Sequence, residues 1–80
     1  MKMLYRLEVS YQTANGKFHR DGEILKEMNY ENEKSGCGFG WRDLVFSFDS
    51  SSQRDKSLYK ISKLSGLRVT LYEIPILEAA

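Results

Sequence analysis

The residues with the clearest potential for chemistry lie at 36–41, in the order Gly-Cys-Gly-Phe-Gly-Trp. This stretch contains the only cysteine and the only tryptophan of the chain. A glycine-rich loop can bind phosphate when its backbone N–H groups approach the anion at the start of a helix. Here a strand pattern follows, without the Lys-Ser or Lys-Thr pair of a phosphate loop. We therefore expect a flexible or tightly turned connection, in which glycine supplies positive φ.

Cys37 is a candidate nucleophile or redox sensor, because its flanking glycines leave the thiol accessible. Its sole histidine partner would be His19, and a Cys–His catalytic pair also needs a third group to orient the base. One cysteine and one histidine fall short of four zinc ligands. We expect no catalytic residue, no metal and no cofactor, and the chain is predicted not to be an enzyme.

The residues at 38–41, Gly-Phe-Gly-Trp, resemble part of the aromatic strand motif of RNA recognition motif domains. In that family two aromatic side chains on the third strand stack on bases. The resemblance implies single-stranded nucleic-acid binding through Phe39 and Trp41. Cys37 stands where the motif has a basic residue, and Arg42 where it has an apolar one. The preceding sequence shows no clear helix followed by a strand, which that family would require.

Hydrophobic alternation at residues 3–11 predicts the first strand, with every second residue apolar. Asn15-Gly16 is the strongest short signal for a type I′ hairpin turn. A hairpin closed there would place Leu7 opposite Ile24, which favours a second strand at 17–28. The alternative is a short helix over Glu23–Glu33. Residues 29–40 have no period and are expected to form a long loop.

The remaining elements follow from a third strand at 41–49 and a helix that begins after Ser50. Ser50 and Gln53 have the spacing of a capping box, and Ser52 with Asp55 is a second cap option. The helix should run to about residue 65, before Gly66. A last strand at 67–74 ends at Pro75, and residues 76–80 form an apolar tail that we expect to dock.

This order predicts one α+β domain over residues 1–80. Its sheet has four strands, mostly antiparallel, with one helix packed on one face (β-β-β-α-β). Leu44, Phe46 and Phe48 would face the helix. The other face, with Trp41 and Val45, would stay partly open.

Charge is unevenly distributed in a chain whose net charge is +1. Residues 50–68 hold five basic and one acidic side chain, and residues 21–33 hold one basic and five acidic. Lys56, Lys60 and Lys63 share one helix side with Tyr59. These patches are either solvated surface or docking sites that steer a charged partner. Self-association of the acidic segment with the basic helix is a variant, so a homodimer is an option.

Composition and length narrow the class of protein further. The 80 residues lack an apolar run near the about 20 residues of a membrane helix, and early charges argue against a signal peptide. We expect a cytoplasmic protein without disulfides.

In size and composition the chain resembles small proteins of phages and mobile elements, among them anti-CRISPR-type inhibitors. The resemblance implies, in the host cytoplasm, a binder that inhibits or regulates a larger protein or ribonucleoprotein complex. Single-stranded nucleic acid is the alternative partner. The predicted partner-binding residues are Phe39, Trp41, Lys56, Tyr59, Lys60 and Lys63.

Overall fold

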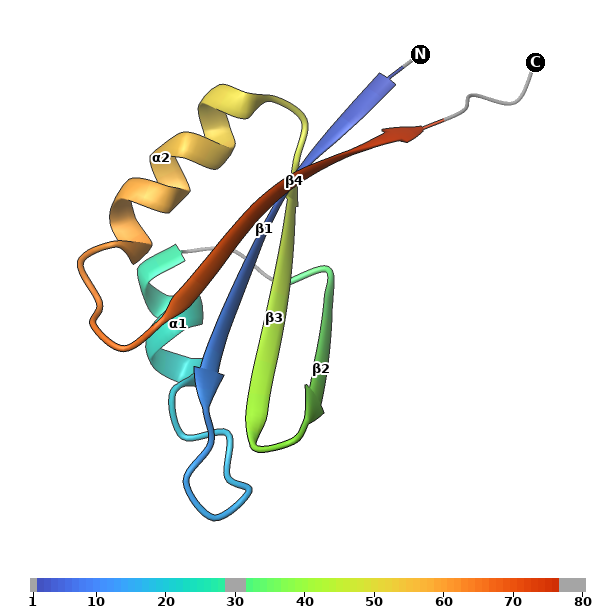
Figure 1. Ribbon diagram of the computed structural model, residues 1–80. Helices are drawn as coiled ribbons and strands as arrows, with labels where there is room; N and C mark the ends of the chain where they lie inside the picture. Colours follow the sequence, from blue (N-terminus) through green and yellow to red (C-terminus); the bar gives the residue numbers. More distant parts are fainter. Residues whose placement is uncertain (1, 29–31, 77–80) are drawn as a thin grey trace.

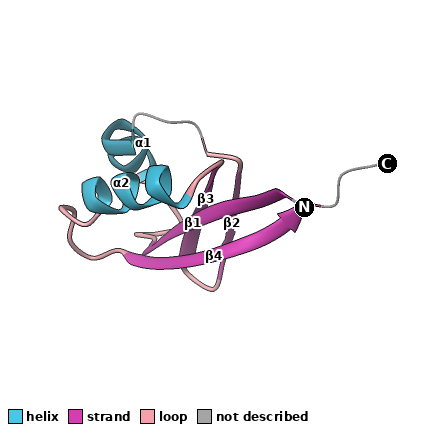
Figure 2. Ribbon diagram, turned by 90° about the horizontal axis from the view of Figure 1, so that it is seen from above, coloured by secondary structure: helices cyan, strands magenta, loops and turns pink. Residues whose placement is uncertain are grey.

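The computed structural model describes residues 2–28 and 32–76. Their elements are, in order, β1 (Lys2–Gln12), α1 (Asp21–Met28), β2 (Lys34–Gly38), β3 (Trp41–Phe48), α2 (Ser51–Ile61) and β4 (Arg68–Ile76). The strands form one antiparallel sheet in the order β2-β3-β1-β4 (Figure 1). Both helices lie on the same face of this sheet, as the view from above shows (Figure 2). The βαββαβ order with these neighbours is the ferredoxin-like arrangement of two split βαβ units.

The predicted α+β class and four-stranded antiparallel sheet are confirmed, but the prediction of one helix is wrong. Residues 17–28 do not form a strand, because the segment contains α1. The Asn15-Gly16 turn is present with positive φ at both residues, yet it closes only the single bridge Ala14↔Lys17. Both edges of β1 are already paired with β3 and β4, so no edge remains for a hairpin partner.

Helix α1 is the alternative that the sequence offered, with bounds Asp21–Met28 in place of Glu23–Glu33. Ile24 and Met28 are one helical turn apart and both are buried. The acidic Asp21 and Glu23 lie in its first turn, where they stabilise the positive end of the helix dipole. The expected helix also covered residues 29–31, which lie outside the described residues.

The expected loop at 29–40 is corrected by β2, which pairs with β3 from Lys34↔Val45 to Gly38↔Trp41. Every residue of β2 is exposed, so it needs only backbone pairing and leaves no hydrophobic pattern in the sequence. Phe39 and Gly40 form the two-residue turn, with φ of 53° and 80°. These two values are typical of a type I′ turn. A helix and a strand therefore do precede β3, contrary to the expectation.

Helix α2 begins as predicted, since the Ser50 hydroxyl accepts a hydrogen bond from the Gln53 N–H at 3.2 Å. It ends at Ile61, four residues earlier than expected, and turns lead to Gly66 with φ of 75°. Strand β4 continues through Pro75 to Ile76, where the sequence predicted an end at the proline. The expected docking of the tail at 77–80 lies outside the described residues.

The core lies between the sheet and the two helices. Full burial of one such large apolar side chain contributes about 1.5–3 kcal/mol. The buried members come from four elements: Leu7, Val9 and Tyr11 of β1, Leu44, Phe46 and Phe48 of β3, Ile24 and Met28 of α1, and Ile61 of α2.

The opposite face of the sheet is covered by no helix or strand of the described chain (Figure 2). Its side chains are largely polar and bond to one another. Arg6 donates to Ser47 at 3.2 Å and to Glu33 at 2.7 Å. Ser10 donates to Asp43 at 2.7 Å. We call this the open face.

Candidate protein-binding surfaces

Four exposed side chains of and after α2 form the α2 lysine surface, which consists of Lys56, Tyr59, Lys60 and Lys63. Helical geometry brings residues three and four positions apart to one side. Tyr59 is 70% exposed, and the Lys63 ammonium lies 5.5 Å from the centre of its ring. The ammonium groups of Lys56, Lys60 and Lys63 form no ion pair with any residue that the structure describes. The sequence predicted that these four residues share one side of the helix, and the structure places them together.

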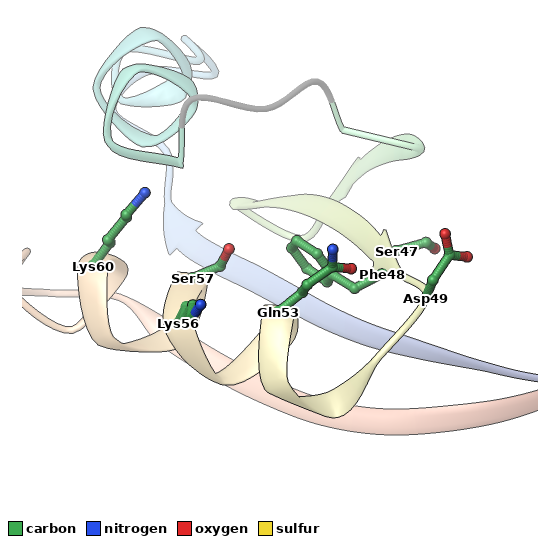
Figure 3. A pocket seen from close by; sticks show the side chains of 7 residues that line it. All are labelled: Ser47, Phe48, Asp49, Gln53, Lys56, Ser57 and Lys60. Carbon is green, nitrogen blue, oxygen red and sulfur yellow. The ribbon is translucent and has the colours of Figure 1, made fainter.

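Two open depressions flank this surface, and Lys56 and Lys60 line both. The first, of about 400 Å³, lies between α2 and the end of β3 (Figure 3). In that view Lys60 and Asp49 stand at its two ends, with Ser57 and Gln53 between them. Its lining residues are Ser47, Phe48, Asp49, Gln53, Lys56, Ser57 and Lys60.

The second depression, of about 540 Å³, continues on the outer side of α2. Tyr59 lines it together with the two shared lysines, so an apolar ring and two cations meet there. Aromatic side chains in such positions are the residue type most enriched among interface anchors. The other two lining residues are Ser52 and Asp55.

Three of the five acidic side chains at 21–33 are paired with arginines within the fold. Asp21 is paired with Arg42 at 2.8 Å, and Glu23 with Arg20 at 3.0 Å. The carboxylate of Glu33 binds the Arg6 guanidinium and accepts from the Ser47 hydroxyl, and both contacts lower the pKa of Glu33. The hydrogen bond from Ser47 is the largest cause. The surplus charge that α2 presents is therefore positive, and it is not balanced by these acids.

Phe39 and Trp41 lie apart from the α2 lysine surface. Trp41 points to the open face, where the Arg68 guanidinium lies 4.4 Å from the centre of its ring. Phe39 is fully exposed in the β2–β3 turn, so it does not lie on the third strand as the resemblance to RNA recognition motif domains implied; only Trp41 does. The six predicted partner-binding residues thus form two groups, and the structure does not bring them into one site.

A third depression, of about 280 Å³, lies beside Trp41 at the end of the molecule that carries the β2–β3 turn. It includes Phe18, which is 43% exposed and lies under the Arg42 guanidinium at 4.0 Å from the ring centre. Sequence reasoning missed Phe18, because the predicted strand at 17–28 gave it no special position. The complete lining is Thr13, Gly16, Phe18, Cys37, Gly38, Gly40 and Trp41.

Tyr11, Asp21 and Arg42 form a polar network that joins β1, α1 and β3. The Tyr11 hydroxyl donates to Asp21 at 2.5 Å, and Arg42 donates to the same carboxylate through two nitrogens. Burial, followed by the hydrogen bond to Asp21, raises the pKa of Tyr11 to about 12. Because Arg42 satisfies Asp21 from the other side, this network fixes α1 on the sheet.

Candidate metal-ligand clusters and membrane-spanning helices are both absent from the described ranges 2–28 and 32–76. These ranges contain no cluster of three His, Cys, Asp or Glu side chains that could hold a metal ion. None of their helices has the length and hydrophobicity needed to cross a membrane. Comparison with protein-family models, curated proteins and solved structures gave no match.

Proposed function

We propose that this chain is a protein-binding module that inhibits or regulates a larger protein or ribonucleoprotein complex. It does so by docking the α2 lysine surface on an acidic surface of its partner. The observation that supports the proposal is the charge balance of the fold. Arginines pair with Asp21, Glu23 and Glu33, whereas the lysines of α2 have no ion-pair partner in the described chain.

The composition of the surface suits this role. Lysines accelerate the approach of an acidic partner and set its orientation, and their contribution falls as salt increases. Tyr59 contributes apolar area that is removed from water on binding, which lysines at the rim do not. We therefore expect Tyr59 to determine how long the complex persists, and the lysines to determine how fast it forms.

The test is affinity capture from host lysate with three tagged proteins. The first is the wild type and the second is the triple variant Lys56→Glu, Lys60→Glu and Lys63→Glu. The third reverses three exposed lysines elsewhere, with Lys17→Glu, Lys26→Glu and Lys34→Glu, and so has the same net charge as the second.

The wild type and the third protein should retain the same partner at low salt, and the α2 variant should lose it. Retention should weaken as salt rises. The proposal is refuted when the wild type retains nothing at low or high salt, or when the α2 variant retains as much as the matched control. Circular dichroism checks that all three proteins are folded.

Binding of single-stranded nucleic acid is the second candidate, and the order of elements favours it. The βαββαβ order extends the resemblance to RNA recognition motif domains beyond the residues at 38–41. Trp41 faces the open side of the sheet, as base stacking requires. A titration of Trp41 fluorescence with a mixed-sequence RNA or DNA oligonucleotide at low salt tests it. Unchanged emission at micromolar protein eliminates this candidate, because a stacked base perturbs indole emission.

A further inference from the structure

The free edge of β4 is the least protected part of the sheet. β4 is a nine-residue edge strand, and its pairing with β1 runs from Lys2↔Ile76 to Ser10↔Arg68 without a bulge. It contains no lysine; its charged side chains are Arg68 at its start and Glu73, and its proline lies near its far end. Lysines, bulges and prolines are the usual protections of a sheet edge against pairing with another strand.

Helix α2 packs against β1 and β3, and it reaches β4 through the ion pair of Arg54 with Glu73 at 3.9 Å. Neither helix covers Leu71. The side chain of Leu71, which points to the helix side of the sheet, is therefore 40% exposed. The described chain exposes four large hydrophobic side chains, and Leu71 is the one that belongs to β4.

The strand registers determine which backbone groups of β4 face solvent. The two-residue turn makes Gly38↔Trp41 a hydrogen-bonded pair, so Trp41 directs its N–H and C=O toward β2. Because these directions alternate along each strand, even-numbered residues of β3 point toward β1. Those residues of β3 pair with odd-numbered residues of β1, so the even-numbered residues of β1 direct their N–H and C=O groups toward β4. They pair with even-numbered residues of β4, which leaves the N–H and C=O groups of the odd-numbered residues of β4 facing solvent. Pro75 agrees independently, since its missing N–H then lies on the solvent side.

We propose that β4 pairs with β4 of a second copy of this chain, antiparallel and about a twofold axis at Leu71. The two sheets then become one continuous sheet. A twofold axis perpendicular to the sheet keeps each residue on its own face, so it pairs Leu71 with Leu71 and Val69 with Glu73 of the other copy. All three of these residues have outward N–H and C=O groups, so three pairs exchange hydrogen bonds.

Neighbouring registers are poorer. A twofold axis at Thr70 or at Tyr72 would leave only two complete hydrogen-bonded pairs within the strand. The axis at Tyr72 would also place Pro75 where an N–H donor is needed. In the register centred on Leu71 no two like charges are directly opposite, because Arg68 faces Ile74 of the other copy. The exposed Leu71 side chains meet at the axis and cover each other.

Pairing of this kind keeps both pairs of helices on one face of the continuous sheet. The α2 lysine surfaces of the two copies then face the same side, which allows two-point attachment to one partner. The proposal concerns a separate surface, so it stands whether or not the α2 lysine surface binds protein.

Cysteine cross-linking tests the register directly. In a background with Cys37→Ser, Leu71→Cys places two thiols across the axis with Cα atoms about 5.5 Å apart, which is within reach of a disulfide. Mild oxidation should give a covalent dimer. Val69→Cys and Glu73→Cys should each stay monomeric alone and should cross-link when mixed. A Leu71→Cys chain that remains monomeric, or single variants at 69 and 73 that cross-link equally well, overturns the proposal.

Sedimentation equilibrium over a range of concentrations measures the association itself. Leu71→Lys places two ammonium groups opposite each other and should weaken dimerisation at least about tenfold. The matched control Phe39→Lys introduces the same charge at another exposed apolar side chain and should leave dimerisation unchanged. A wild type that is monomeric at every concentration overturns the proposal, as does a dimer that Leu71→Lys leaves intact. Circular dichroism establishes folding, and the cysteine variants decide the matter if Leu71→Lys does not fold.

Discussion

Replacement of Tyr11 by phenylalanine tests the network that fixes α1 on the sheet. Tyr11 is 1% exposed, and its hydroxyl donates to Asp21, which Arg42 also binds. Tyr11→Phe keeps the ring in the core and removes one hydrogen bond to a charged acceptor. Such bonds contribute about 1.5–3 kcal/mol, so we expect a loss of that size in the free energy of unfolding at neutral pH.

The difference in stability between the wild type and Tyr11→Phe should change with pH in the alkaline range. The pKa of Tyr11 is raised to about 12 in the folded protein from 10.0 in the unfolded chain. Below pH 10 both states hold the proton, so the titration of Tyr11 does not change stability with pH there. Between about pH 10 and 12 the unfolded chain releases the proton first, and the wild type progressively loses about 3 kcal/mol of stability in all. Tyr11→Phe has no such proton and does not share this loss.

Urea unfolding of both proteins, followed by circular dichroism from neutral pH to pH 11.5, measures the difference. All other titrating groups occur in both proteins and cancel in it. The advantage of the wild type should shrink above pH 10 and be nearly absent at pH 11.5. A difference that is the same at pH 8 and pH 11.5 would refute the reasoning, because it would mean that Tyr11 titrates alike in both states.

Three further predictions concern single side chains, each checked by urea unfolding. Phe39→Asn should raise stability by about 1 kcal/mol, because a bulky residue at positive φ is strained and asparagine is not; an unchanged midpoint would count against strain there. Ser50→Ala should lower stability by about 1 kcal/mol through loss of the helix cap, whereas Ser52→Ala should not. If both lower it equally, the cap assignment fails. Glu33, whose pKa is lowered by the Ser47 hydroxyl, contributes stability that is present above its unfolded pKa and lost as pH falls. Glu33→Gln should therefore flatten the loss of stability between pH 5 and 3, and an unchanged acid profile would contradict this.

The elements that the sequence predicted well are those with one buried face. β1 and β3 show alternation, and α2 has a cap that Ser50 and Gln53 specify. The segment with α1 satisfied two patterns, because Ile24 and Met28 fit both a helical turn and a hairpin register. Only the competition of β3 and β4 for the edges of β1 decides between them, and this competition is not visible in a local window. β2 has no buried side chain, so no pattern could reveal it.

The candidate surfaces were predictable to the extent that helical spacing determines them. That spacing placed Lys56, Tyr59 and Lys60 on one side of α2, where the structure has them. The sequence could not show that Arg6 and Arg42, which are distant along the chain, pair with Glu33 and Asp21 of the acidic segment. Arg42 pairs with Asp21 only because β3 and α1 meet, and this depends on the strand order. The separation of Phe39 from the lysines has the same origin.

The central position of β1 has a consequence for folding during synthesis. β1 is translated before the other elements of the sheet, yet one of its two neighbours is β4, so that Lys2 pairs with Ile76. Until the last described residues leave the ribosome, β1 has one unpaired edge, and the contacts that complete the sheet span nearly the whole chain. Folds with such distant contacts form slowly, since the loop must close before any contact stabilises it. A nascent chain that ends before β4 should therefore remain unable to complete its sheet, and the unpaired edge of β1 is where misassembly would begin.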